Sequence, residues 1–371
     1  MRTQAALYGD IDLELSWSEE ELPERERTKH VHRLHPYLGK FVPQLAEAFI
    51  RRYAQPGDLV WDPFAGSGTT LVQALESGYD ATGVDIAAFN ALLMRVKTAR
   101  YNLFTLEHEL RDACRRLEAL EPTPMRNSPY VRRWFAPRAA AELIGFRSLV
   151  TDYEHREVLD VVLARAARSA RLTTHFDLEF PRAPQHGAYW CHKHKRECRP
   201  VERAEHFLRR YALDTVARVK LFARIRVRGR RASILHGDAR TLDLGGPYDA
   251  IITSPPYPGL IDYHEQHRYA YELLGLDDLS GQELGRGSTK QAIADYIEGV
   301  ACVLERAAER LHRGGCVVIV VNDRRDVYPE ILERAGLACE HRLRRHVNRR
   351  TGRRAGEFFE DVLVARKLSR S

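Results

Sequence analysis

The sequence lacks any apolar run near the ~18 residues that a membrane-spanning helix needs, so no membrane segment is expected. Residues 1–10 carry no basic-then-apolar targeting pattern. The six cysteines are scattered through 371 residues, which is typical of reduced thiols rather than of a disulfide framework. Internal repeats and low-complexity tracts are also missing. These absences predict a cytoplasmic globular chain.

The composition allows two or three domains, since one domain usually takes ~100–200 residues. Hydrophobic residues make up 44% of the 371, enough to bury a sizeable core. The net charge is +7 and the pI is about 9.1, with arginine dominating the basic residues. Arginine binds phosphate in a bidentate manner, so nucleic acid is a sensible partner. Charge alone leaves open a basic protein without a polyanionic partner.

Two unusual turns follow short apolar runs. The first, Asp62-Pro63-Phe64-Ala65-Gly66-Ser67-Gly68-Thr69-Thr70, lies between an apolar run at 59–61 and a helical pattern at 71–75. The second, Thr253-Ser254-Pro255-Pro256-Tyr257, follows the apolar run 248–252. Ligands of open α/β sheets bind at the carboxyl ends of strands. The two turns therefore predict one pocket with a cofactor half and a substrate half.

Two common phosphate-binding motifs do not fit the first turn. A dinucleotide fingerprint needs a third glycine or an alanine where Leu71 stands. A P-loop needs a lysine after the last glycine, and none follows Gly68. A turn that merely joins a strand to a helix would not need this whole string of residues.

Together, the two motifs resemble those of the S-adenosylmethionine-dependent amino-methyltransferases of DNA. Ser254-Pro255-Pro256-Tyr257 is most similar to the cytosine-N4 branch, whereas the adenine-N6 branch more often has Asp at the position of Ser254. The resemblance covers about residues 30–100 and 230–367. The glycine motif comes first here, which departs from the common order among Ser-Pro-Pro-Tyr enzymes and leaves open where target recognition lies.

The resemblance implies an α/β fold with a seven-stranded, mostly parallel, Rossmann-like methyltransferase sheet. Strands are expected to begin at residues 59, 81, 233, 249, 316, 337 and 359, with an antiparallel last strand. A large, mainly helical insert follows the second strand. The expected domains are an acidic segment at 1–28, a catalytic domain at 29–100 and 231–371, and a target-recognition insert at 101–230 that is helical over 138–170.

Cofactor binding is expected along the first turn and at two acids. Asp85 lies 19 residues after Gly66, where a carboxylate accepts hydrogen bonds from ribose hydroxyls or else caps a helix. The resemblance assigns Asp238 to the exocyclic amine of the adenine of the cofactor, and a simple turn is the alternative. Residues 35–41 enclose the methionine end or form a basic surface loop. The full candidate set is Tyr37, Lys40, Phe41, Asp62, Pro63, Phe64, Gly66, Ser67, Gly68, Thr69, Asp85 and Asp238.

The second turn suits methylation of an exocyclic amine, which is a poor nucleophile because its lone pair is delocalised. Ser254 Oγ and the carbonyl of Pro255 can accept the two N–H bonds and localise that lone pair. Pro256 has no competing N–H, and Tyr257 can stack on a base flipped out of the duplex. Direct transfer needs no covalent intermediate. None of the six cysteines follows a proline, so a Pro-Cys cytosine-C5 mechanism is excluded.

Two stretches are candidate DNA contacts. Residues 342–354 hold seven arginines, and residues 175–199 mix histidine, aromatic and basic side chains. The candidate contacts are Arg344, Arg345, Arg349, Arg350, Arg353, His192 and Lys193, with a solvated basic loop as the alternative. Cys191, His194 and Cys198, with His175 or His186, invite a metal interpretation. Because they lack paired Cys-x-x-Cys spacing, we expect a recognition loop without metal.

The sequence thus predicts a site-specific methyltransferase that acts on cytosine N4 in double-stranded DNA at the nucleoid, in a restriction–modification setting with a cognate endonuclease. Adenine-N6 methylation of DNA and guanine-N2 methylation of RNA remain alternatives. A non-catalytic DNA-binding protein is the alternative from another class.

Overall fold

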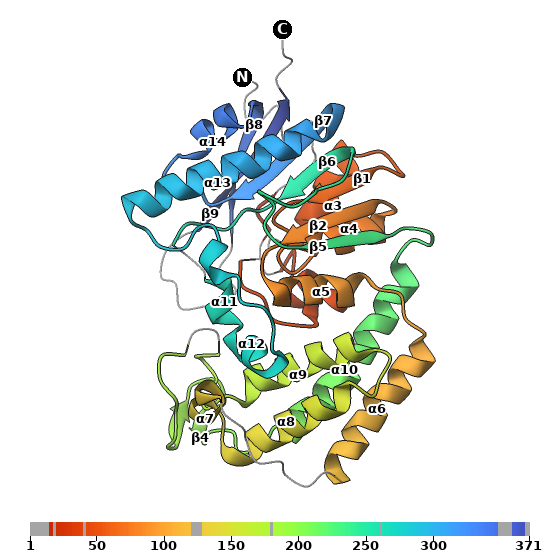
Figure 1. Cartoon of the computed structure of the whole chain (residues 1–371), viewed down its shortest axis with the longest axis vertical. Coiled ribbons are helices and arrows are strands. Elements are labelled where there is room, and N and C mark those ends of the chain that lie inside the picture. Colours follow the sequence, from red (N-terminus) through yellow and green to blue (C-terminus); the bar gives the residue numbers. More distant parts are fainter. Residues whose placement is uncertain are drawn as a thin grey trace.

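The computed structural model describes residues 15–17, 20–39, 42–119, 128–178, 181–259, 262–347 and 358–367. A seven-stranded sheet with helices on both faces forms one end of the molecule, and a helical region forms the other (Figure 1). The predicted α/β methyltransferase-type architecture is therefore confirmed.

The sheet has the strand order β5-β2-β1-β6-β7-β9-β8. Its members are β1 (Leu59–Asp62), β2 (Asp80–Asp85), β5 (Ala232–His236), β6 (Tyr248–Thr253), β7 (Leu311–Val321), β8 (Leu337–His346) and β9 (Phe359–Lys367). β9 runs antiparallel to both of its neighbours, whereas β5, β2, β1, β6 and β7 are parallel. β7 starts at Leu311 rather than at Cys316, because Leu311 pairs with Tyr248 ahead of an irregularity in the register.

Alternate residues of the central strands face two hydrophobic cores, as the two-residue period of a strand requires. Val60 and Ile252 pack with α3 (Pro43–Tyr53) and α4 (Thr69–Ser77). Trp61 and Ile251 pack with α13 (Lys290–Glu309) and α14 (Tyr328–Arg334). The central strands are thus buried on both faces, which is usual for a parallel sheet.

A third core lies in the helical region, which α5 (Ala88–Thr98) joins to the sheet. Its helices are α6 (Leu103–Ala119), α7 (Pro129–Trp134), α8 (Pro137–Val150), α9 (Arg156–Ala170), α10 (Glu205–Ile225), α11 (Tyr263–Gln266) and α12 (Arg268–Leu274). The helical structure expected over 138–170 is present as two helices, α8 and α9, separated by a short turn. At that turn the Glu109 carboxylate accepts the backbone N–H groups of Glu154 and His155, both at 3.0 Å, and so fixes the segment that leads into α9.

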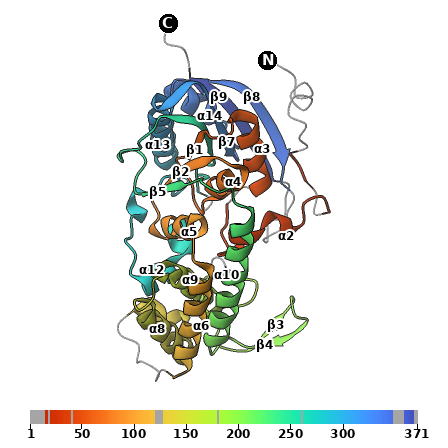
Figure 2. The same cartoon turned by 90° about the vertical axis from the view of Figure 1, so that its right-hand side faces the viewer.

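A separate two-stranded hairpin, β3 (Tyr189–Cys191) and β4 (Arg196–Cys198), projects from the helical region (Figure 2). Three short helical turns complete the described structure: α2 (Glu24–Arg27), η1 (His30–Arg33) and η2 (Ser280–Gln282). Among the helices of the described residues, none has the length and apolar character to cross a membrane.

Residues 15–17 lie against the edge strand β8. Leu15 is buried in the core beside Leu343, and Ser16 Oγ accepts the backbone N–H of His346 at 2.9 Å. This segment covers part of a sheet edge that would otherwise present unpaired backbone groups.

Close packing of α4 on β2 generates a stability prediction. A Cβ at Gly83 would lie 2.8 Å from both terminal carbons of Leu71 and 3.0 Å from the Cβ of Ala65. Gly83→Ala should therefore lower the free energy of unfolding by about 1–3 kcal/mol through overpacking.

Urea unfolding followed by circular dichroism measures this change. Gly281→Ala is the matched control, since a Cβ at Gly281 would meet no heavy atom within 4 Å. Equal midpoints for both variants would contradict the packing argument.

Candidate active site

The strand order reverses between β1 and β6, and the pocket lies at this switch point, as the rule for open α/β sheets requires. The pocket encloses about 790 Å³ of space, counting its open mouth. Its walls include Tyr37, Pro63, Phe64, Gly66, Ser67, Thr69, Asp85, Asn90, Asp238, Ser254, Pro256, Tyr263 and Glu283. The turns after β1 and β6, which the sequence singled out, therefore meet in one pocket.

The glycine turn needs its glycines. Gly66 has φ of 50° and Gly68 has φ of 80°, in the left-handed region that side chains disfavour. A Cβ at Gly66 would also lie 3.0 Å from the Tyr37 hydroxyl. The buried Lys97 ammonium donates to the carbonyl of Ser67 at 2.6 Å and fixes the turn from behind.

The Asp85 carboxylate ties the glycine turn to the start of α5. Oδ2 accepts the Gly66 backbone N–H at 2.8 Å, and Oδ1 accepts the Ala87 N–H at 2.8 Å and the side-chain amide of Asn90 at 3.0 Å. Three of the roughly four lone-pair sites of a carboxylate are thus used. Burial raises the pKa of Asp85 to about 6.

Asp238 lines the other side of the pocket. Its carboxylate receives the Arg240 guanidinium on both oxygens, at 3.0 Å from Nε and 2.6 Å from Nη2, together with the Arg240 backbone N–H at 2.9 Å. Burial by itself would raise the pKa of Asp238. The hydrogen bonds and the ion pair with Arg240 outweigh burial, so the pKa is lowered. The adenine contact assigned to Asp238 stays a prediction.

Asp62 is a correction to the predicted cofactor set. It is 1% exposed, and its carboxylate accepts the hydroxyls of Thr70 and Thr253 at 2.7 and 2.6 Å. A side chain so enclosed cannot touch a ligand, so it joins β1, α4 and β6 behind the pocket wall. Gly68 is likewise absent from the wall, and Lys40 and Phe41 lie outside the described residues.

Ser254 stands at the end of β6 and faces the pocket. Its hydroxyl donates to the backbone carbonyl of Val320, on the neighbouring β7, at 2.8 Å. Because the proton is committed there, the lone pairs of Oγ are available to accept from a group in the pocket.

The stacking role predicted for Tyr257 also needs correction. It is 9% exposed, and its hydroxyl donates to the Glu360 carboxylate at 3.1 Å inside the core, so its ring is not free to stack on a base in this conformation. Burial raises the pKa of Glu360. Pro256 lines the pocket, whereas Pro255 and Tyr257 are not part of its wall.

The DNA contact predicted for Arg345 is the third prediction that needs correction. It is 4% exposed, and its Nε lies 3.7 Å from the same Glu360 carboxylate. Adjacent residues of a strand point to opposite faces, so Arg344 and Arg345 of β8 cannot both face DNA. Arg344 is the exposed one and lies over the Phe359 ring at 4.6 Å.

Some of the remaining candidate DNA contacts lie within the described residues and others lie outside them. His192 and Lys193 are exposed at the turn of the β3–β4 hairpin. Arg349, Arg350 and Arg353 lie outside the described residues. Contact with DNA stays a prediction for all of these side chains and for Arg344.

Sequence reasoning missed three polar residues of the pocket, Asn90, Gln282 and Glu283. Asn90 joins Asp85 to the Tyr37 hydroxyl, each at 3.0 Å, and lies one turn into α5. Glu283 is brought in by a loop, where its carboxylate accepts from the Tyr263 backbone and lies 3.0 Å from His264 Nδ1. No local motif marks Glu283, because only the fold brings its loop to the strand ends.

Comparisons with known proteins identify the family of the chain. A family model described as DNA methylase, of the N6 and N4 type, matches residues 6–92. The type II methyltransferase M.MjaII of Methanocaldococcus jannaschii is 34% identical over 430 residues, covering 92% of this chain and 81% of the relative. The type II methyltransferase M.MvaI of Kocuria varians is 39% identical over 70 residues, which are 18% of this chain and 15% of the relative.

Among solved structures, TrmN of Thermus thermophilus aligns with a TM-score of 0.37 at 15% identity, over 89% of this chain and 50% of the other. The assignment of the family therefore rests on the relatives found by sequence. With more than two thirds of M.MjaII covered at this identity, the chain belongs to the N6/N4 family of DNA methyltransferases, and its cofactor is S-adenosylmethionine.

Proposed function

We propose that the chain methylates the exocyclic N4 amine of cytosine in double-stranded DNA. The observation that carries this proposal is the hydrogen bond from the Ser254 hydroxyl to the carbonyl of Val320. It leaves Ser254 as an acceptor at the place where an amine would enter. The serine, in place of the aspartate usual for adenine-N6 enzymes, favours cytosine.

The reaction needs positioning more than a strong base. When bound, S-adenosylmethionine supplies an electrophilic methyl group on a sulfonium. Ser254 Oγ would accept one of the two amine N–H bonds and orient the amine lone pair toward the methyl group, so that an N–C bond would replace the S–C bond. The Pro255 carbonyl, which the sequence suggested as the second acceptor, is not part of the pocket wall. The released proton goes to solvent. Pre-placed acceptors of this kind stabilise the charge that develops in the transition state.

The pocket supplies groups suited to the cofactor. Ser67 Oγ and Asn90 Oδ1 are buried oxygens that have no hydrogen-bond partner among the described residues, and both residues line the pocket. A polar ligand would satisfy them. We assign Asp85 to the ribose hydroxyls, with its fourth lone-pair site, and Tyr37 to the wall near Gly66.

The inserted part of the helical region, within residues 101–230, is proposed as the target-recognition domain, since base flipping requires the enzyme to hold the duplex. Because both similar relatives are type II methyltransferases, we also propose a restriction–modification role with a cognate endonuclease. Adenine-N6 methylation is the second candidate, because the family that matches includes both chemistries.

The decisive experiment is nucleoside mass spectrometry of DNA from a host that expresses the protein. N4-methylcytosine should appear with the intact chain, and Ser254→Ala should reduce methyl transfer by roughly 100-fold while cofactor affinity stays within a few-fold. N6-methyladenine instead would overturn the assignment of Ser254.

Ser148→Ala is the matched control for that variant. Its hydroxyl also donates to a backbone carbonyl, that of Gly145 at 2.7 Å, but it lies in α8. Equal losses in the two variants would indicate a stability effect rather than a role in the pocket.

Cofactor binding should depend on pH through Asp85. Because burial raises its pKa to about 6, the carboxylate is an acceptor above that pH and is protonated below it. Affinity for S-adenosylmethionine, measured by calorimetry, should be flat from pH 7 to 8 and should fall by up to about tenfold per unit below pH 6.

Asp85→Asn should bind the cofactor weakly and without this pH step, since an amide nitrogen cannot accept from Gly66. The control is Asp62→Asn, because burial also raises the pKa of Asp62 to about 6. If the pH step vanished in Asp62→Asn and persisted in Asp85→Asn, the assignment would be wrong.

The two neighbouring arginines of β8 should behave differently. Arg344→Ala should weaken DNA binding and reduce the slope of log affinity against log salt by about 0.9. Arg345→Ala should leave that slope unchanged and lower stability by about 3 kcal/mol, because it removes one partner of a buried charge pair with Glu360. Filter binding and urea unfolding of both variants provide the test, and swapped phenotypes would refute the placement.

A further inference from the structure

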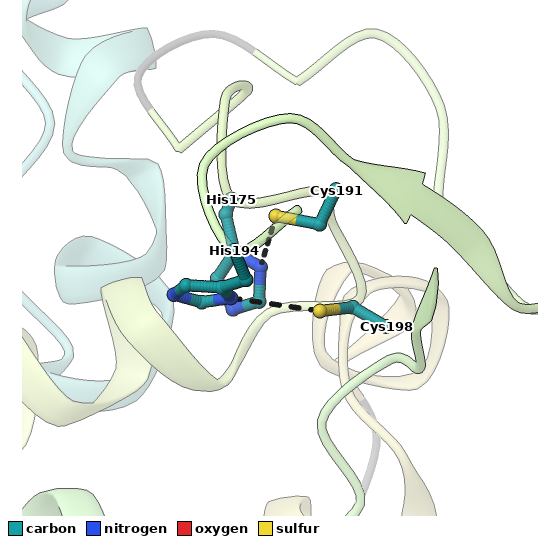
Figure 3. A group of neighbouring side chains, drawn as sticks. All are labelled: His175, Cys191, His194 and Cys198. Atoms are coloured by element: carbon teal, nitrogen blue, oxygen red, sulfur yellow. Dashed lines mark hydrogen bonds between the residues drawn. The ribbon is translucent and has the colours of Figure 1, made fainter. Parts of the chain in front are cut away.

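Four side chains of types that can ligate a metal converge beside the hairpin, where the sequence analysis expected a recognition loop without metal. His175 comes from the loop after α9, Cys191 ends β3, His194 lies in the hairpin turn and Cys198 ends β4. One ligand atom from each lies within 4.8 Å of all the others. Both sulfur atoms point toward the pair of imidazoles (Figure 3).

The distances suit a tetrahedral ion. Cys191 Sγ lies 3.4 Å from His175 Nδ1, and Cys198 Sγ lies 3.5 Å from His194 Nδ1. Zinc bonds of about 2.3 Å to sulfur and about 2.0 Å to nitrogen, at tetrahedral angles, place such atoms about 3.6 Å apart. The two imidazole rings are 4.5 Å apart between centroids and nearly perpendicular.

Apolar packing contributes little to the stability of the hairpin. Within the described residues 181–200, only Cys191 and Cys198 are buried. The large apolar side chains nearby face solvent, with Trp190 58% and Phe176 48% exposed. A two-stranded hairpin with so little apolar burial is marginally stable in water, so an additional cross-link is needed.

The hairpin turn places His194 next to Cys191. The His194 backbone N–H donates to the Cys191 carbonyl at 3.2 Å, which brings the two side chains to one side of the turn. Lys195 follows with φ of 53°, a left-handed conformation that commonly closes a hairpin turn.

We propose that His175, Cys191, His194 and Cys198 form a structural zinc site that fixes the β3–β4 hairpin to the loop after α9. Two thiolates and two imidazoles are a donor set that zinc prefers, and all four tetrahedral positions would be filled by protein. With no open position, the metal has a structural rather than a catalytic role.

A second cluster of possible ligands, Glu109, Glu154 and His155, does not compete with this assignment. The Glu109 carboxylate already accepts the backbone N–H groups of Glu154 and His155 in the turn before α9. The second cluster contains no thiol, so the two clusters can be told apart by spectroscopy.

The zinc site would set the position of the basic side chains at the hairpin turn. Lys193, Lys195 and Arg196 are all exposed there. A fixed hairpin presents these charges to a DNA phosphate backbone in one arrangement. This consequence rests on the proposed DNA methylation, whereas the presence of zinc does not.

Elemental analysis of the full-length, reduced protein, purified without chelator or metal-affinity resin, tests the site. About one zinc per chain is expected, and Cys191→Ser with Cys198→Ser should lower the zinc affinity at least about 10–100-fold. His194→Gln should also lose zinc, whereas His192→Gln, in the same turn, and Cys339→Ser should retain it.

Cobalt substitution keeps the proposal testable even if these variants fail to fold. Cobalt added to the zinc-free, wild-type chain should give the intense visible bands of a tetrahedral site and thiolate charge-transfer absorption. Failure to retain zinc together with absence of these bands would overturn the proposal. So would full zinc retention in the folded double cysteine variant.

Trypsin provides a readout of the structural role. Cleavage after Lys193, Lys195 or Arg196 should be slow in the zinc-loaded chain and at least several-fold faster after chelation, with S-adenosylmethionine binding unchanged. Equal cleavage rates would refute the role in fixing the hairpin. Loss of zinc without loss of DNA affinity would refute the DNA consequence alone and leave the metal site in place.

Discussion

The Asp85 carboxylate joins the glycine turn after β1 to the first turn of α5, and the site depends on this junction. It accepts backbone N–H groups from both segments and holds Asn90, which in turn holds the Tyr37 hydroxyl. Burial of this charge is costly, and the hydrogen bonds from backbone and amide offset the cost. This side of the pocket, where we propose that the cofactor binds, is therefore preorganised by the protein's own hydrogen bonds.

A parallel arrangement holds the substrate half. Asp62 ties β1 to β6 through the Thr253 hydroxyl, and the next residue, Ser254, is tied to β7 through the Val320 carbonyl. Tyr257 is then anchored on Glu360 of β9. Neighbouring strands thus position the Ser-Pro-Pro-Tyr turn, and a rigid turn is what methylation of a weakly nucleophilic amine requires.

The helical region makes the molecule more than a methyltransferase sheet. Its core is continuous with α5, so the pocket floor and the helices share one packed interior. The hairpin lies outside that core, with only its two cysteines buried. A metal cross-link there would give a small basic projection the order that hydrophobic packing provides elsewhere.

The sequence by itself determined the sheet, the two turns and the family, because apolar runs, glycines with positive φ and a Ser-Pro-Pro-Tyr string are local signals. It placed Ser254, Asp85 and the glycine turn correctly at strand ends. The position of the turn between α8 and α9 was not predicted, because a carboxylate from α6 fixes that turn. Tertiary structure alone decided that Asp62, Tyr257 and Arg345 face inward, and that His175 joins Cys191, His194 and Cys198. Direction and proximity across long stretches of chain depend on packing, which no local pattern of residues encodes.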